Sequence, residues 1–310
     1  FDYFHAVAAM HLEAGLDEKG KATALLHRSA FPTIASTFAP GAKSGAPFEL
    51  SMGLTDMPFH IPNFRAENGP AENHVRIGWL RAVCNVFHAF ALHSFMDELA
   101  HLAGQDPLDY LLDALGKPRQ LDLKAENVDY GNYGQPLDRY PIDTGRLRHV
   151  IEKVAEQSNW RSTSPKPGRG MGIAAHRSFL AYVAVVATVD VDAEGQITLP
   201  RMDIAIDAGK LINPDRVHAQ MEGCAVFGAS IALYGEITAK NGRIQQTNFN
   251  SYRVARMAEA PKEIHIHLVE SDEPPGGVGE PGVPPVAPAI GNALFAANGQ
   301  RVRDLPMVKA

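Results

Sequence analysis

A single carboxylate, that of Glu280, lies inside a run of glycines and prolines that extends from Gly276 to Pro285. Glycine allows close approach of the backbone and proline fixes φ, so such a segment holds its one charged side chain on a stiff, narrow loop. The apolar residues 286–297 follow and have the character of a helix. A carboxylate held at the mouth of a helix is a candidate general base. The alternative interpretation is a structural turn whose glutamate is solvated.

The same loop contains a misleading motif, because residues 277–282 fit the pattern G-x-G-x-x-G. A dinucleotide-binding loop needs a preceding strand, a helix that begins within the motif and an acidic residue about 20 residues later. Pro281, Pro284 and Pro285 stand where that helix would begin, and residues 298–300 offer no acid. We therefore reject a dinucleotide-binding fold.

The composition limits the function further. The chain has 310 residues, of which 45% are hydrophobic, and its net charge is -6 without a basic stripe, so nucleic acid is excluded as a partner. Cys84 and Cys224 are too few to ligate an iron–sulfur cluster, and we expect buried thiols. No apolar run approaches the roughly 20 residues of a membrane span, and no secretory signal is present. No metal signature is found: His265 and His267 alternate on a predicted strand, where a solvated face is favoured over a two-histidine site.

The elements that must position Glu280 follow from periodicity. A β-hairpin is predicted over residues 1–32, and the chain starts so abruptly that we expect a processed or truncated C-terminal piece. Helices are predicted at 86–103, 108–115, 145–157 with Thr144 as cap, and 215–233. Strands are predicted at 181–192, 197–206 and 264–269, with a further hairpin at 237–250. The fold class is therefore α+β (mixed α/β), in two lobes at residues 1–125 and 140–310 on either side of a turn-rich stretch.

Four segments together resemble a known family. They are Leu80–Asn85 before a helix, His218–Gly223 within a helix, Gly279–Pro281 with the following Pro285–Ile290, and Gly168–Ala174. In type and order they are similar to the large, molybdopterin-binding subunit of the xanthine dehydrogenase and aldehyde oxidoreductase family. Within it, the resemblance is to the beta subunit of isoquinoline 1-oxidoreductase and to membrane-associated aldehyde dehydrogenases. It covers the whole chain but only the C-terminal portion of the longer family members, so we expect an N-terminal half elsewhere.

The resemblance implies roles for individual residues. In the family, a Mo-bound hydroxide attacks the substrate carbon, and the position of Glu280 matches the base that removes the hydroxide proton. Arg81 matches an arginine near the metal and substrate, with a surface salt bridge as its alternative. Ala82 and Gly279 flank these two residues and are expected at the cofactor. Gln220 matches a glutamine that binds the pterin or an axial ligand, with a polar helix face as its alternative.

Glycines at alternate positions give one further expectation about the cofactor. Gly168, Gly170 and Gly172 are predicted to lie in a loop whose peptide N–H groups could bind a pyrophosphate. The resemblance implies that the molybdopterin is the cytosine dinucleotide form. A flexible connector is the alternative interpretation of these glycines.

Two functions from different classes remain. The first is part of a molybdenum hydroxylase that oxidises an aldehyde or an N-heteroaromatic carbon and passes electrons to a [2Fe-2S] cluster on a small partner subunit. The resemblance also allows a cytochrome subunit, and either a periplasmic, membrane-associated or a cytoplasmic location. The second is a non-catalytic fragment that contributes only to the cofactor interface. A hydrolase that uses Glu280 is disfavoured, because no second carboxylate or nucleophile accompanies it.

Overall fold

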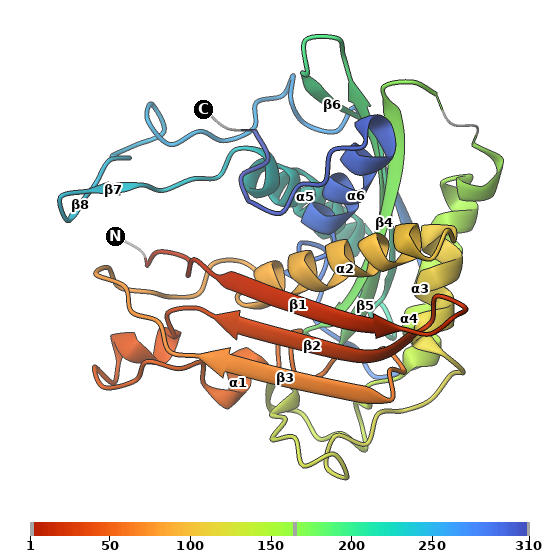
Figure 1. Cartoon of the computed structure of the whole chain (residues 1–310), viewed down its shortest axis with the longest axis horizontal. Coiled ribbons are helices and arrows are strands. Elements are labelled where there is room, and N and C mark those ends of the chain that lie inside the picture. Colours follow the sequence, from red (N-terminus) through yellow and green to blue (C-terminus); the bar gives the residue numbers. More distant parts are fainter. Residues whose placement is uncertain (1–2, 164–165, 309–310) are drawn as a thin grey trace.

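The computed structural model describes residues 3–163 and 166–308. Helices and two main sheets form an α+β fold, as predicted (Figure 1). The smaller sheet has the order β1-β2-β3, with strands Ala9–Leu16, Ala22–Ala30 and Asn63–Gly69. The larger has the order β4-β5-β6-β9, with strands Arg169–Ser178, Ala181–Val191, Ile197–Asp207 and Glu263–Leu268. Within it β4, β5 and β6 are antiparallel neighbours, whereas β9 runs parallel to β6.

Helices cover both faces of the larger sheet. Val183, Val185 and Ala187 of β5 pack in one core with helices α5 (Pro214–Leu233) and α6 (Val286–Asn298). The alternate residues of β5, among them Ala184 and Val186, pack in a second core. That core contains helices α2 (Asn85–Leu102), α3 (Pro107–Leu115) and α4 (Thr144–Gln157). Because every second residue of a strand points to the same face, one apolar strand builds both cores.

Local capping explains where the helices begin. The Asp106 carboxylate accepts hydrogen bonds from the peptide N–H groups of Leu108 and Asp109, and Pro107 occupies the first position of α3. Asn213 caps α5 in the same way. The expected cap of α4 is wrong: Asp143 accepts from the first turn, whereas the Thr144 hydroxyl bonds to Arg119. Aspartate and threonine are both good caps, so sequence alone did not separate two neighbours.

The remaining elements are short. They are η1 (Ile34–Thr37), α1 (Pro47–Leu50), η2 (Asn132–Gly134), η3 (Trp160–Ser162), β7 (Ala239–Lys240) and β8 (Arg243–Ile244). The hairpin predicted over 237–250 is thus reduced to two-residue strands around its turn. The N-terminal hairpin is confirmed as β1 and β2, although β1 begins only at Ala9. Residues 1 and 2 of the predicted hairpin lie outside the described ranges. No helix in the described ranges is long and apolar enough to cross a bilayer.

The expected division into lobes at 1–125 and 140–310 stays a prediction. The second core takes residues from both sides of that division, since α2 and α3 pack there together with α4 and β5. Helix α6 also packs against α2 (Figure 1). Segments far apart in the sequence are therefore held against one another around the ends of α2, α5 and α6.

Candidate active site

Arg81 stands at the centre of a polar cluster, just before α2. Its Nε donates a hydrogen bond to the carbonyl oxygen of Gly279 at 2.6 Å, and its Nη2 donates to Oε1 of Gln220 at 2.8 Å. The guanidinium also lies over the ring of Phe227, 5.7 Å from its centroid. The side chain is half-buried, so these three contacts fix the direction of the positive charge. Arg81, Gln220 and the Gly279–Glu280 segment therefore lie together, and the roles expected for them stay predictions.

Glu280 is hydrogen-bonded to the residue that follows Arg81. Its Oε2 accepts a hydrogen bond from the peptide N–H of Ala82 at 2.8 Å. Ala82 is fully buried, whereas Glu280 is half-exposed and Gly279 is exposed. Among the residues that the structure describes, Oε1 of Glu280 has no donor. One carboxylate oxygen is thus fixed by the backbone and the other is free to accept a proton.

The loop that carries Glu280 is anchored at both ends. The peptide N–H of Gly277 donates to the carbonyl oxygen of Phe179, in the turn between β4 and β5, at 2.7 Å. At its other end, a Cβ on Gly282 would come within 2.7 Å of the Cβ of Cys224 and 2.9 Å of the sulfur of Met221. Glycine at 282 is therefore needed for the loop to lie against α5. These contacts explain how a segment without regular structure holds a carboxylate in one place.

One face of α5 supplies the remaining side chains of the cluster. Gln220, Cys224 and Phe227 are spaced by four and three residues and therefore share that face. The thiol of Cys224 is 3.9 Å from the carbonyl oxygen of Gly279. Burial raises the pKa of Cys224 to about 11, so the group at this position is a neutral thiol. The expectation of buried thiols is confirmed for Cys84 and Cys224.

The turn between Arg81 and α2 has an unusual backbone. Ala82 and Val83 both have positive φ values, of 73° and 49°. A residue with a Cβ in this region costs about 1–2 kcal/mol, and a β-branched residue is a true outlier there. Such strain persists only where the surroundings enforce it, and it clusters at functional sites. The donor of the Glu280 hydrogen bond belongs to this strained turn.

The expectation that Gly170 and Gly172 lie in a loop is wrong, and their role in binding a phosphate stays untested. Gly170 and Gly172 lie in strand β4, paired with Val189 and Ala187 of β5. A Cβ on Gly170 would come within 2.2 Å of the carbonyl oxygen of Ala293, in helix α6 above the strand. The two glycines therefore allow α6 to pack directly on β4. Close helix packing and a phosphate loop both require glycine, so the sequence pattern did not separate them.

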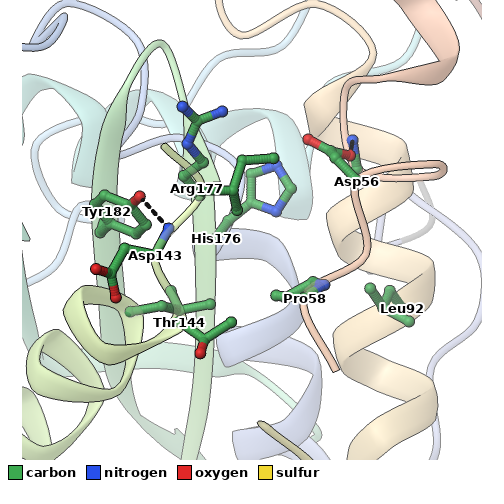
Figure 2. A pocket seen from close by; sticks show the side chains of 11 residues that line it. Asp56, Pro58, Leu92, Asp143, Thr144, His176, Arg177 and Tyr182 are labelled. Atoms are coloured by element: carbon green, nitrogen blue, oxygen red, sulfur yellow. Dashed lines mark hydrogen bonds between the residues drawn. The ribbon is translucent and has the colours of Figure 1, made fainter. Parts of the chain in front are cut away.

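A second polar cluster lies beside the second core and lines a small cavity (Figure 2). Burial raises the pKa of Asp56 there to about 7. The buried guanidinium of Arg177 donates to Oδ1 of Asn132 at 2.8 Å, and the hydroxyl of Tyr182 accepts from the N–H of Asp143 at 2.8 Å. These residues share no member with the Arg81–Glu280 cluster.

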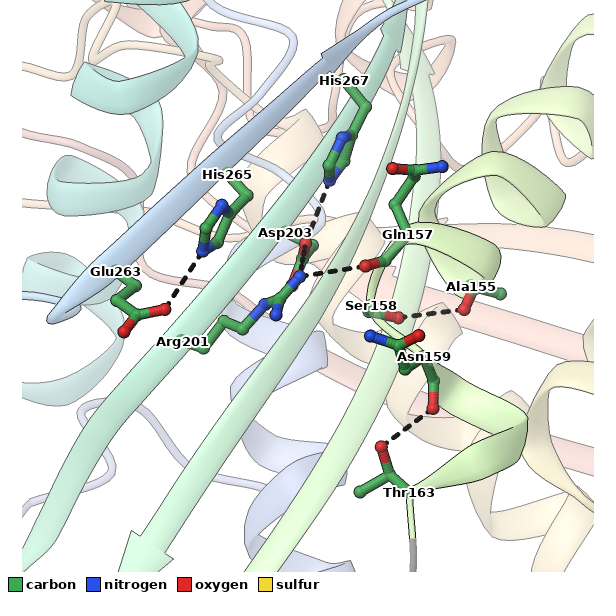
Figure 3. A network of polar contacts seen from close by, with 10 residues as sticks. All are labelled: Ala155, Gln157, Ser158, Asn159, Thr163, Arg201, Asp203, Glu263, His265 and His267. Carbon is green, nitrogen blue, oxygen red and sulfur yellow. Dashed lines mark hydrogen bonds and ion pairs between the residues drawn. The ribbon is translucent and has the colours of Figure 1, made fainter.

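The two alternating histidines of β9 take part in a third network (Figure 3). Nε2 of His267 lies 3.0 Å from Oδ1 of the buried Asp203, which also accepts from Arg201. His265 is more exposed and pairs with Glu263 at 3.2 Å. The expectation of a solvated face holds for His265 but not for His267, whose ring is mostly buried. Within the described ranges, no group of three or more His, Cys, Asp or Glu side chains is arranged to hold a metal ion.

Sequence reasoning missed four contributors to the cluster. The N–H of Ala82 was missed in its role as donor to Glu280, because a backbone group carries no signal in the residue type. Cys224 and Phe227 could have been found from their helical spacing to Gln220. Asn85 was quoted only as part of a motif, although its side chain is fully buried next to the strained turn.

Comparisons with known proteins show a family model and relatives that the chain resembles. Residues 111–261 match the family model described as a molybdopterin cofactor-binding domain. The chain is 32% identical to the membrane-bound aldehyde dehydrogenase [pyrroloquinoline-quinone] of Gluconacetobacter polyoxogenes, over 99% of this chain and 40% of that protein. It is 31% identical to isoquinoline 1-oxidoreductase subunit beta of Brevundimonas diminuta, over 80% of this chain and 29% of that protein.

A solved structure shares the fold. The aldehyde oxidoreductase from Desulfovibrio gigas superposes on this chain with a TM-score of 0.75 at 15% identity. The superposition covers 97% of this chain and 48% of the aldehyde oxidoreductase chain. The chain thus spans less than half the length of each of these proteins.

Proposed function

Because the chain belongs to the molybdopterin-binding subunits of the xanthine dehydrogenase and aldehyde oxidoreductase family, we propose that it forms part of a molybdenum hydroxylase that oxidises an aldehyde or an N-heteroaromatic carbon. The observation that carries this proposal is the convergence of Arg81, Gln220 and Glu280 from three distant segments. The two substrate classes are those in the names of the relatives, an aldehyde and isoquinoline.

The donor set of the cluster fits a pterin cofactor. Within the described residues, the amide nitrogen of Gln220 and Oε1 of Glu280 have no hydrogen-bond partner, and both side chains reach solvent. A heterocycle edge needs donors and acceptors side by side, which these groups supply. We infer that Gln220 and the peptide of Gly279 bind the cofactor edge, whereas the N–H of Ala82 serves to hold Glu280. The cytosine dinucleotide form, a [2Fe-2S] partner subunit and the remainder of the molybdenum subunit belong to the same proposal.

The proposed reaction is the hydroxylation of a carbon atom by water, coupled to a two-electron oxidation. An oxygen derived from water replaces the hydrogen of the substrate C–H bond, and two electrons and two protons are released. When bound, the molybdenum cofactor supplies that oxygen and accepts the two electrons. Oε1 of Glu280 accepts one proton, while the N–H of Ala82 holds the other oxygen in place. The guanidinium of Arg81, oriented by Gly279 and Gln220, stabilises negative charge that develops on the substrate.

The test is Glu280→Gln in the complete enzyme. We expect correct folding and full molybdenum content but a loss of turnover of at least about 100-fold, the lower range for a lost general base. Glu270→Gln is the matched control, because Glu270 is exposed and loses the same charge ten residues earlier. Activity in Glu280→Gln close to that of the control would overturn the assigned role.

The second candidate function, a fragment that contributes only to the cofactor interface, is tested by metal analysis. Molybdenum and released pterin are measured in the purified enzyme, together with pyrroloquinoline quinone, because the name of the Gluconacetobacter relative specifies that group. Stoichiometric molybdenum and pterin support the hydroxylase. Pyrroloquinoline quinone without molybdenum refutes it.

A further inference from the structure

A buried asparagine at the start of α2 is hydrogen-bonded to the strained turn. The side chain of Asn85 is fully buried at the start of α2. Its Nδ2 donates a hydrogen bond to the carbonyl oxygen of Ala82 at 3.0 Å. The same carbonyl oxygen accepts from the peptide N–H of Asn85 at 3.1 Å. Two donors of Asn85 thus fix the carbonyl group of Ala82. The N–H group of the same residue, Ala82, donates to Glu280.

The orientation of the Asn85 amide is itself determined. Its Oδ1 lies 2.8 Å from Nε2 of His176 and accepts from the hydroxyl of Tyr133 at 3.3 Å. Burial and the neighbouring rings of His93 and His88 hold the pKa of His176 well below its usual value, so the ring is neutral. The carbonyl oxygen of Ala82 can only accept, so the NH₂ group of Asn85 must face it, and Oδ1 then accepts from the tautomer of His176 that carries its proton on Nε2. The amide therefore has one consistent arrangement.

The turn needs such a clamp, because its conformation is unfavourable by itself. Ala82 and Val83 are both in the left-handed region, which residues with a Cβ disfavour. If the carbonyl oxygen of Ala82 were released, residue Ala82 would relax toward negative φ. Its N–H would then rotate away from Oε2 of Glu280. The carboxylate would lose the one donor that it has among the described residues.

We propose that Asn85 is a positioning residue that aims the Ala82 N–H at Glu280 by holding the strained Ala82–Val83 turn. This inference rests on the proposed role of Glu280 as the base. Asn85 is fully buried and acts through residue Ala82: it bonds the carbonyl group on one side of the Ala82 Cα, and the N–H group on the other side donates to Glu280. Ala82 thus connects the buried contacts of Asn85 with His176 and Tyr133 to the candidate site.

The first experiment uses Asn85→Leu in the complete enzyme. Leucine has a similar volume but no polar group, so the clamp is lost while the space stays filled. Because a displacement of about 1 Å at a reacting group can reduce turnover about 100-fold, we expect kcat to fall about 10- to 100-fold with little change in KM. Hydrogen exchange of the turn amides of Val83 and Asn85, which bond within the turn, is expected to accelerate.

The second experiment separates a positioning role from a general packing role. Glycine adopts positive φ without strain. Ala82→Gly added to Asn85→Leu should therefore restore most of the lost kcat and slow the hydrogen exchange. Ala91→Gly added to Asn85→Leu is the matched control: Ala91 lies inside α2 and should restore neither.

The outcomes are distinguishable from failure of the proposed function. If Glu280→Gln keeps its activity, the proposed base is wrong, whatever Asn85 does. If Glu280→Gln is inactive but Asn85→Leu matches the parent enzyme, only the inference about Asn85 is wrong. Asn85→Leu that folds only when Ala82→Gly is present supports the inference. Failure of both variants to fold, or equal rescue by Ala91→Gly, refutes it.

Discussion

Gly172→Ala provides a test of how the fold positions the candidate site. A Cβ at residue 172 would lie 2.3 Å from both the carbonyl oxygen of Ala289 and the amide nitrogen of Ala293. Both atoms belong to the backbone of α6, so no side chain can rotate away to relieve the overlap. An ordinary contact begins at 3.4 Å, so α6 or β4 must move by about 1 Å.

The magnitude follows from this overlap. Forcing a methyl group into a closely packed interior costs about 1–3 kcal/mol, and contact with two backbone atoms places Gly172→Ala at the upper end, about 3 kcal/mol. In a chain of this size each kcal/mol lowers Tm by about 2 °C, so we expect a fall of about 6 °C. Because Pro285 caps α6 and ends the Glu280 loop, the shift of α6 should also lower turnover.

Thermal unfolding of the complete enzyme checks this prediction against Gly41→Ala. A Cβ on Gly41 meets nothing within 4 Å, so that variant should differ from the parent by less than about 0.5 kcal/mol. Molybdenum content is measured in parallel. A Tm for Gly172→Ala equal to that of Gly41→Ala would refute the packing argument. Loss of cofactor at an unchanged Tm would instead favour a direct contact between this glycine segment and the cofactor.

Two further predictions concern buried titratable groups. Asp56 has a pKa raised from 3.8 to about 7 by burial, so the folded state binds a proton that the unfolded state has lost between these values, and stability should fall as pH rises from 4 to 7. Asp56→Asn should remove this slope and unfold at a higher Tm than the parent above pH 7, and parallel Tm–pH curves would contradict the assignment. Burial raises the pKa of Cys224 to about 11 and that of Cys84 well above its usual value, so neither thiol should react with iodoacetamide at pH 8 until urea is added. Mass spectrometry of the native enzyme checks this, and rapid labelling of either cysteine would refute it.

Local sequence signals predicted the helices well and the sheet less well. Asp106-Pro107 and Asn213-Pro214 mark helix starts by cap chemistry that needs no tertiary information. In contrast, the parallel pairing of β9 with β6 joins residues about 60 positions apart. The sequence pattern of β9 predicts a strand but does not indicate which strand it pairs with. The same limit applies to residues 168–174, where a strand under a helix and a glycine loop share one sequence pattern. Strand pairing and helix packing depend on tertiary contacts, which local sequence patterns do not contain. These contacts determined the structure of β9 and of residues 168–174.

The candidate site shows the same division. Arg81 and Gln220 were identified through family resemblance, whereas Glu280 was a candidate base already from its glycine–proline loop. Their convergence follows from hydrogen bonds that span 139 and 198 residues. The stiff character of the Glu280 loop could be derived from its glycines and prolines. Its anchors on Phe179 and Cys224 could not, because both lie on other elements.

The strained turn explains why the remainder was hidden. At Val83, a β-branched residue, every local rule argues against positive φ, so the sequence predicts an ordinary helix entry there. Sequence rules fail where the surroundings impose a conformation that the residues themselves disfavour, and such places are expected at functional sites. Here the surroundings are Asn85 behind the turn and Glu280 in front of it. The most informative departure from local preference thus lies at Ala82 and Val83, the turn that connects the buried Asn85 to the proposed base.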